Sequence, residues 1–387
     1  MRFVLDAEQT AFARSLDALL TASDTPSVVR SWSAGDHAAG RALWSRVGDA
    51  GVFALAVPEA YEGFGPRPVE LAVAFVELGR HVVPGPLVET VAAASLLTDP
   101  GPAKRFLPGL AAGETVATVA MPGSGPYVLD GDVADVELIV TGGSGGTGAS
   151  GASGASGASG ASGASGASGA SGASGASGAT VAGAGESSAG ELRLTAVPGS
   201  ASSEVAGGPV RRSLDPARRL CLPRPGGELL AAGPHVASGA DAALTWARLA
   251  TAAQALGVGL ALLDRTVTYV KQRSQFGVPI GSFQAVRHRL ADAKIALEFA
   301  RPLLFGAALT MDPADVAAAK VTACEAAYAT ARTALQLHGA IGYTAEYDLS
   351  LWLTKARALR GAWGTPEQCR ELVLAADGVS GGARRRP

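Results

Sequence analysis

The residues best suited to chemistry lie in one run, from Arg273 to Asp292, between two predicted helices. The run reads Arg-Ser-Gln-Phe-Gly-Val-Pro-Ile-Gly-Ser-Phe-Gln-Ala-Val-Arg-His-Arg-Leu-Ala-Asp. An arginine directly after a helix, beside an aromatic ring and a glycine turn, can hold a pyrophosphate with paired donors while the ring packs on a flat group. The ordinary alternative is an arginine that satisfies the last carbonyls of its own helix. Residue types alone favour this second interpretation.

No set of side chains in the sequence makes a catalytic constellation by itself. The five histidines include no H-E-x-x-H pair, no serine lies in a G-x-S-x-G turn, and nothing resembles a P-loop. Cys221, Cys324 and Cys369 match neither a zinc site nor a disulfide framework, and so indicate a reducing compartment. We therefore expect no metal, and any enzyme chemistry must come from a bound cofactor.

The overall composition excludes several classes of protein. The chain has 387 residues, of which 48% are hydrophobic and 17% charged, and its 32 Lys+Arg and 34 Asp+Glu leave a net charge of −2. This balance argues against a nucleic-acid surface or a polybasic membrane patch. The N-terminal residues contain no apolar run of signal-peptide length, and no segment reads as a membrane span. We expect a cytoplasmic protein.

Hydrophobic spacing divides the chain into three regions of an α+β fold. Residues 1–113 read as amphipathic helices, and residues 114–236 read as short β-strands separated by glycine and proline clusters. Helical periods return at 237–380, ahead of a tail at 381–387. The predicted order is a helical domain, a small β domain and a helical bundle.

Particular patterns support these assignments. Leu256, Leu260 and Leu263 lie on one face of a predicted helix, and residues 136–140 and 192–195 read as strands.

A low-complexity segment interrupts the β region. The triplet Gly-Ala-Ser runs ten times from Gly148 to Ser177, without the proline that a collagen triple helix needs. Side chains this small cannot bury enough surface to offset the entropy cost of ordering. We predict a disordered loop at about residues 142–190 that has little effect on folding.

Several stretches together resemble the signature of the acyl-CoA dehydrogenase family. They are Arg-Ser-Gln-Phe-Gly at 273–277 with its continuation to Asp292, Pro-Glu-Ala-Tyr-Glu-Gly-Phe-Gly at 58–65, Glu-Leu-Gly-Arg at 77–80, and Gln-Leu-His-Gly-Ala-Ile-Gly-Tyr at 336–343. The resemblance covers nearly the whole chain outside the repeat. It implies an N-terminal α-helical domain, a central small β-barrel or sandwich, and a C-terminal four-helix bundle.

The resemblance also implies FAD, an oligomer and a reaction. In this family two turns reach into a neighbouring subunit's flavin, within a homo- or heterotetramer. The cofactor-binding residues implied here are Arg273, Gln275, Phe276, Gln336, Gly339, Gly342 and Thr365. The implied reaction is the α,β-dehydrogenation of an acyl-CoA thioester to a trans-2-enoyl-CoA, in which a carboxylate takes the α proton and the β hydrogen leaves as hydride. Electron-transfer flavoprotein is the implied acceptor, in fatty acid or steroid side-chain degradation.

The positions of the family's catalytic base are the main departure. The usual Glu belongs to a turn that here reads Ala-Trp-Gly-Thr, so Trp363 stands in its place. The alternative position, on the helix before the Arg-Ser-Gln-Phe-Gly run, falls on Ala247, directly before Arg248, to which the resemblance gives a substrate-binding role. Glu367, one helical turn beyond Trp363, and Asp348 are the remaining candidates for a base.

The β domain departs from the family as well. Ala-Met-Pro-Gly-Ser-Gly-Pro at 120–126 replaces the acidic stretch with which relatives line their own flavin. The residues with which the family contacts a neighbouring subunit's flavin are kept. The residues with which it lines its own flavin are changed. This pattern resembles a subunit of a heteromeric enzyme that lacks the catalytic Glu and completes its partner's flavin site. Two alternatives stay open: a homomeric flavoenzyme with an atypical base, and a flavin-free CoA-binding or scaffold protein.

Overall fold

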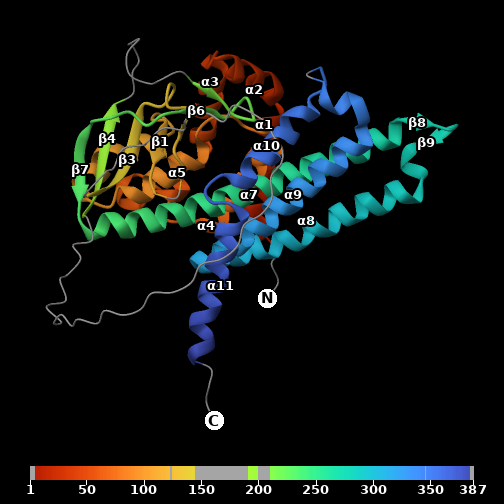
Figure 1. Cartoon of the computed structure of the whole chain (residues 1–387). Coiled ribbons are helices and arrows are strands. Elements are labelled where there is room, and N and C mark those ends of the chain that lie inside the picture. Colours follow the sequence, from red (N-terminus) through yellow and green to blue (C-terminus); the bar gives the residue numbers. More distant parts are fainter. Residues whose placement is uncertain (1–4, 123, 144–190, 199–209, 345, 384–387) are drawn as a thin grey trace, which may run out of the picture.

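The computed structural model describes residues 5–122, 124–143, 191–198, 210–344 and 346–383, and these form three regions in the predicted order (Figure 1). The Gly-Ala-Ser repeat lies outside the described residues, so the prediction of a disordered loop there stays a prediction. The helical domain, the small sheets and the helical bundle confirm the predicted fold class.

The N-terminal region is helical, and capping chemistry explains where its helices begin. Asp6 and Gln9 make a reciprocal capping box at the first helix, with the Gln9 backbone nitrogen 2.8 Å from Asp6 Oδ1. Proline occupies the first turn of three other helices, where its missing N–H costs nothing. The elements described here are α1 (Ala7–Thr21), α2 (Thr25–Ala34), α3 (Ala38–Asp49), η1 (Phe53–Ala56), η2 (Glu59–Tyr61), α4 (Pro68–Arg80), α5 (Leu87–Leu96) and α6 (Pro100–Ala111).

The described part of the β region contains two small sheets. Its strands are β1 (Ala117–Ala120), β2 (Val128–Leu129), β3 (Val136–Gly143), β4 (Glu191–Pro198), β5 (Arg211–Arg212), β6 (Arg219–Cys221) and β7 (Glu228–Ala232). One sheet has the order β1-β3-β4-β7, in which β1 and β3 run parallel and the other neighbours antiparallel. The other has the order β2-β6-β5. β3 and β4 pair along their whole length without a shift in register. The last pair is Gly143 with Glu191, and the repeat lies between these two residues in the sequence.

The C-terminal region is a bundle built around one long helix. Its elements are α7 (Pro234–Gln272), β8 (Ser274–Gln275), β9 (Val278–Pro279), η3 (Ile280–Ser282), α8 (Gln284–Thr310), α9 (Pro313–His338), η4 (Gly339–Tyr343), α10 (Leu349–Gly361) and α11 (Pro366–Ala383). α7, α8, α9 and α10 pack together, and α11 packs on α9. α11 continues to Ala383, so residues 381–383 belong to this helix rather than to a tail.

Helix α7 is the central element of the molecule. It begins at Pro234, slightly before the predicted boundary at 237, because Gly233 with φ +126° and a proline in the first turn start the helix there. α7 is long and apolar enough to cross a membrane, but 89% of its most apolar window is buried inside the protein. Its length and hydrophobicity therefore belong to a core helix.

Helices α4 and α7 cross at two glycines. A Cβ on Gly79 would lie 2.1 Å from the Gln254 carbonyl oxygen, and one on Gly257 would lie 1.9 Å from the Val76 carbonyl oxygen. Both distances are far shorter than any real contact, so the backbones touch here and only glycine fits. This crossing fixes the N-terminal region against the bundle.

Two features lie at opposite ends of α7 (Figure 1). The β sheets lie beside its first half, and the β8–β9 hairpin projects beyond its last residue. With 39 residues at 1.5 Å each, α7 is about 58 Å long. Residues at its two ends therefore cannot contribute to one site within the same chain.

Candidate functional site

The turn at 361–364, at the family's usual base position, is buried and tightly held. Trp363 is 4% exposed with φ +57°, and Gly364 follows with φ +117°. Arg248 Nε donates to the Trp363 carbonyl oxygen at 3.1 Å, and Lys320 Nζ donates to the Gly364 carbonyl oxygen at 2.7 Å. Two buried cations thus anchor successive carbonyls of a strained turn, which fixes the direction of the indole.

A cavity of about 220 Å³ lies beside this turn, between the β region and the helices. It is lined by Glu89, Val119, Ser124, Pro126, Tyr127, Leu129, Ser213, Arg218, Leu220, Ala358, Gly361, Ala362 and Trp363. Polar and apolar surface contribute almost equally to this wall. The charged side chains in the lining are Glu89 and Arg218.

Glu89 is the residue of this cavity that the sequence analysis missed. It lies in α5 and is 3% exposed. Trp363 lines the same cavity, and Arg218 Nη2 lies 3.9 Å from Oε1. Oε2 has no hydrogen-bond partner among the residues that the structure describes. Burial raises the pKa of Glu89, against the lowering effect of the Arg218 charge.

The other carboxylates proposed as a base lie elsewhere. Glu367 is exposed in the first turn of α11, where hydrogen bonds to its backbone and from Thr365 lower its pKa. Asp348 forms an exposed ion pair with Arg30. Neither residue lines the cavity. Thr365 makes reciprocal capping hydrogen bonds with Gln368 at the start of α11.

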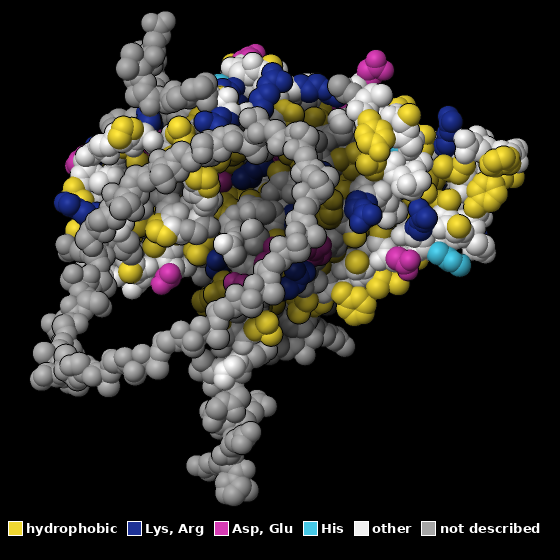
Figure 2. Space-filling view, in the orientation of Figure 1, with side chains coloured by type: hydrophobic (Ala, Val, Ile, Leu, Met, Phe, Trp, Pro, Cys, Tyr) yellow, Lys and Arg dark blue, Asp and Glu magenta, His cyan; other side chains and the backbone are white. Residues whose placement is uncertain are grey.

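The predicted residues Arg273, Gln275 and Phe276 form the exposed hairpin beyond α7. Phe276 is 92% exposed with φ +55°, and it is followed by Gly277 with φ +81°. Figure 2 shows hydrophobic side chains gathered at this end of the molecule. Arg248 of α7 contacts the Trp363 turn and so lies beside the cavity. Arg273 follows about 25 residues later, about 38 Å further along the axis of α7.

The second predicted turn lies at the same end of the bundle as the hairpin. The Tyr269 ring, one turn before the end of α7, stacks on His338 with centroids 4.1 Å apart. Gln336 and Gly339 line a groove of about 990 Å³. Gly342 is buried beneath this turn. The two turns predicted to contact flavin therefore lie at the same end of the bundle, and both are separate from the cavity at Trp363.

The groove has the chemistry that a dinucleotide's phosphate half requires. Arg289 and Arg332 add cations to the Gln336 amide, and Tyr343 adds an aromatic ring. A Cβ on Gly339, whose φ is +66°, would meet nothing within 4 Å, so the backbone there is open to a ligand. These residues fit the pyrophosphate and adenosine part of FAD.

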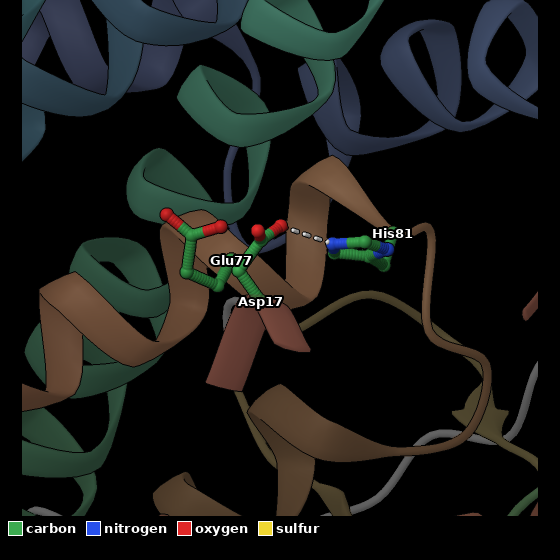
Figure 3. A group of neighbouring side chains, drawn as sticks. All are labelled: Asp17, Glu77 and His81. Atoms are coloured by element: carbon green, nitrogen blue, oxygen red, sulfur yellow. Dashed lines mark hydrogen bonds and ion pairs between the residues drawn. The ribbon is translucent and has the colours of Figure 1, made fainter. Parts of the chain in front are cut away.

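The described residues also include one group of potential metal ligands, Asp17, Glu77 and His81 (Figure 3). Their ligand atoms lie within 4.8 Å of one another, and His81 Nε2 lies 2.8 Å from Asp17 Oδ1. Arg80 Nε lies 3.6 Å from Glu77 Oε2. Ion pairs account for this group, and the absence of a metal stays a prediction.

A helical domain, small β sheets and a bundle with these two turns define a flavin-dependent dehydrogenase fold. The model of the acyl-CoA dehydrogenase N-terminal domain matches residues 6–114, and that of the C-terminal domain matches residues 237–376. Together they cover more than half of the chain. The chain belongs to the acyl-CoA dehydrogenase family, and its cofactor is FAD.

Individual relatives agree with this assignment. Acyl-CoA dehydrogenase IpdE2 of Mycobacterium tuberculosis is 29% identical over 352 residues, which cover 90% of this chain and 91% of the relative. The structure of the ChsE4–ChsE5 complex from the same organism has a TM-score of 0.72 and 23% identity over 100% of both chains. The steroid acyl-CoA dehydrogenase Tcur3481–Tcur3483 has a TM-score of 0.72 and 23% identity over 96% of this chain and 99% of its own.

Proposed function

We propose that this chain is a subunit of a heteromeric, FAD-dependent acyl-CoA dehydrogenase and completes the flavin site of a related partner. The observation that carries the proposal is the position of the hairpin. Arg273 lies about 38 Å along α7 from the level of the chain's own cavity, too far to contribute to it, and this distance supports a role for the hairpin in another subunit. The groove at Gln336 opens at the same end and offers Arg289 and Arg332 to the same ligand.

Two further observations favour a partner that carries the base. Trp363 and Ala247 occupy the two positions where the family places its catalytic Glu, and both are buried in this chain. Two of the similar structures are named as pairs of different chains, ChsE4–ChsE5 and Tcur3481–Tcur3483. We propose the same kind of pairing here.

The proposed reaction is the conversion of an acyl-CoA to a trans-2-enoyl-CoA. FAD, when bound, accepts the hydride from the β carbon. Arg273, Gln275, Phe276 and the Gln336 turn hold and orient the cofactor's phosphate half, and Thr365 remains a proposed contact. One similar structure is named as a steroid acyl-CoA dehydrogenase. This name favours a bulky acyl group over a short straight chain. We place the reaction in the cytoplasm, with electron-transfer flavoprotein as acceptor.

The test is the flavin content of the assembled complex. Arg273→Ala should release FAD without unfolding the chain, because paired charge-assisted hydrogen bonds to the pyrophosphate are lost. Lys271→Ala is the matched control, since this exposed cation lies in the last turn of α7, two residues earlier. Flavin is measured by absorbance after gel filtration of the chain alone and with candidate partners. Full flavin in the Arg273 variant, or full flavin in the chain alone, would contradict the proposal.

The two alternatives have less support. A homomeric enzyme that uses Glu367 or Asp348 as base is disfavoured. Glu367 is exposed, Asp348 is half-buried in an ion pair with Arg30, and both lie outside the cavity lining. A flavin-free CoA-binding or scaffold protein does not explain the groove that Arg289, Arg332 and Gln336 line.

A further inference from the structure

We propose that His338 is a positioning residue that joins the two turns predicted to hold FAD, and that protonation of its buried ring releases them. The inference rests on the proposed function, because it takes the hairpin at residues 273–279 and the turn at residues 339–343 as the flavin contacts. It goes beyond that function by naming a side chain that lies behind the groove and a condition, acidity, under which flavin is lost.

His338 lies where the two turns meet the helical bundle. It is the last residue of α9, directly before η4. Its imidazole stacks on the Tyr269 ring, with centroids 4.1 Å and planes 22° apart. The Tyr269 carbonyl oxygen accepts a hydrogen bond from the Arg273 backbone nitrogen at 2.9 Å, where α7 ends and the hairpin begins. One ring contact therefore connects the base of the hairpin with the start of the second turn.

Further contacts hold the imidazole in place. The Tyr269 hydroxyl donates to the His338 carbonyl oxygen at 3.4 Å, and the centroid of the Tyr347 ring lies 5.5 Å from that of the imidazole. A Cβ added to Gly342 would lie 3.3 Å from the His338 Cβ, so the second turn packs closely on this residue. The imidazole is thus held between α7, η4 and the segment before α10.

The hydrogen bonds of the ring define its protonation state. Nδ1 lies 2.8 Å from the Ala334 carbonyl oxygen, which can only accept, so Nδ1 carries the proton and Nε2 the lone pair. His338 is 5% exposed, and Nε2 has no hydrogen-bond partner among the described residues. An unpaired lone pair on a neutral ring costs far less than a buried, unpaired charge. A second proton, on Nε2, would create such a charge.

The groups around the ring offer no negative charge to stabilise that proton. Two phenols face it, Tyr269 from α7 and Tyr347 from the segment before α10. Charged side chains on the elements packed against it engage other groups or solvent: Arg265 stacks on Trp352, Arg332 lines the groove, Asp348 pairs with Arg30, and Glu346 is exposed.

Acid should therefore weaken flavin binding. Burial lowers the pKa of His338 below its ordinary value, so the ring is neutral and the two turns are joined at neutral pH. When the pH falls through this lowered pKa, the charged imidazole must leave its buried position, and the contact between the two turns is lost. Because one proton is coupled to this loss, the affinity for FAD should fall about tenfold for each pH unit below the pKa.

The test measures the affinity for FAD of the wild-type complex and of His338→Phe by equilibrium dialysis, from about pH 7.5 to about pH 5. Phenylalanine keeps a ring against Tyr269 and cannot be protonated. His288→Phe is the matched control, because His288 is exposed on α8. We expect the affinity to fall below about pH 6.5 in the wild type and in the control. In His338→Phe we expect FAD to bind at neutral pH and the fall to be absent.

A second measurement is independent of flavin. NMR of the chain with ¹⁵N-labelled histidine reports the tautomer and the pKa of His338, whose signals are identified by their loss in His338→Phe. We expect the Nδ1–H tautomer and a pKa below about 6.5. Amide hydrogen exchange, corrected for intrinsic rates, should show residues 273–279 and 339–343 losing protection together as the ring titrates.

A further variant keeps the test valid if His338→Phe does not fold. Tyr269→Leu removes the stacked ring and opens the imidazole to solvent. The pKa of His338 should then rise toward its ordinary value, and both segments should be less protected already at neutral pH. An unchanged pKa in this variant would show that the stack does not enclose the imidazole.

Each outcome decides the proposal. A fall in FAD affinity that persists in His338→Phe, a pKa of His338 at or above about 6.5, or loss of protection in only one of the two segments would overturn it. A complex that binds no FAD at any pH would overturn the proposed flavin site instead. The NMR and exchange results would then decide whether His338 joins the two turns.

Discussion

At the scale of single residues, the turn at 361–364 shows that a carboxylate can be absent from a motif while one from a distant helix lies beside the same cavity. Trp363 stands where the family usually has a carboxylate, and Glu89, from a helix more than 270 positions earlier, lines the same cavity. A motif records which residue occupies a turn. It does not record which side chains from other helices reach the same point.

Restoring the family's residue type at this turn should therefore fail. Trp363→Glu would place a second carboxylate against Glu89 in a buried cavity, where two like charges cannot both ionise easily. Loss of the packed indole adds a cost of about 3–5 kcal/mol to the free energy of unfolding. We expect a lower melting temperature and no gain in α-proton exchange. Trp363→Phe, which keeps most of the bulk, should be much less destabilising; a Glu variant as stable as the Phe variant would contradict this account.

Glu77 gives the chain a measurable pH dependence. Burial raises its pKa from 4.5 to about 7, in spite of Arg80. The folded state therefore keeps a proton that the unfolded chain has lost between about pH 4.5 and 7, so this residue lowers stability as the pH rises through that interval. Glu77→Gln should leave stability unchanged at pH 4 and increase it at pH 8, by up to about 2 kcal/mol after allowance for solvent screening. Urea unfolding at the two pH values measures this, and equal effects at both would contradict it.

The residues that the sequence analysis identified differ from those that it missed in where they lie along their elements. Arg273 directly follows α7 and Gln336 lies in the last turn of α9, and the glycines that come after each give a recognisable spacing. Glu89 and Lys320 act from within helices, and their partners, Arg218 and the Gly364 carbonyl, are distant in sequence. One signal was available: each is a charged residue on an apolar helix face, and such residues are rarely buried without a partner. The partner could not be named without the fold.

At the scale of elements, long periodic segments were predictable and very short ones were not. The helical periods at residues 256–263 lie within α7, and the predicted strands at 136–140 and 192–195 lie within β3 and β4. β2 and β5 have two residues each, too few to carry a period. Their positions depend on hydrogen bonds to β6, which are fixed only when the chain folds.

The pairing of β3 with β4 makes the repeat dispensable for the sheet. The two strands are in register up to Gly143 and Glu191, so the connection need only join two adjacent ends. Deleting Ala149 to Ala176 should change the free energy of unfolding by no more than about 1 kcal/mol, because closure entropy depends only logarithmically on loop length. Thermal unfolding of the deletion variant checks this. A fall of more than about 8 °C would show that the segment contributes contacts of its own.

At the scale of the whole molecule, buried charges join the β region to the bundle. Lys355 on α10 and Asp215 in the loop before β6 lie 3.5 Å apart, and both side chains are almost fully buried. Removing one partner leaves an uncompensated charge in the interior, so Lys355→Met should cost about 3–5 kcal/mol. The double variant Lys355→Met with Asp215→Asn should recover much of that loss. A double-mutant cycle measured by chemical denaturation checks this, and additive losses would contradict it.

The glycine crossing of α4 and α7 has a consequence for motion. Where backbones touch at Gly79 and Gly257, no side chains can repack to let the helices slide, so the N-terminal region and the bundle move as one body. α5, with Glu89, packs on α7 and moves with them. The cavity can therefore widen only on the side of the β region. Amides of β1 and β6 should exchange with solvent faster than those of α4 and α7, and bound substrate should slow exchange in these strands first.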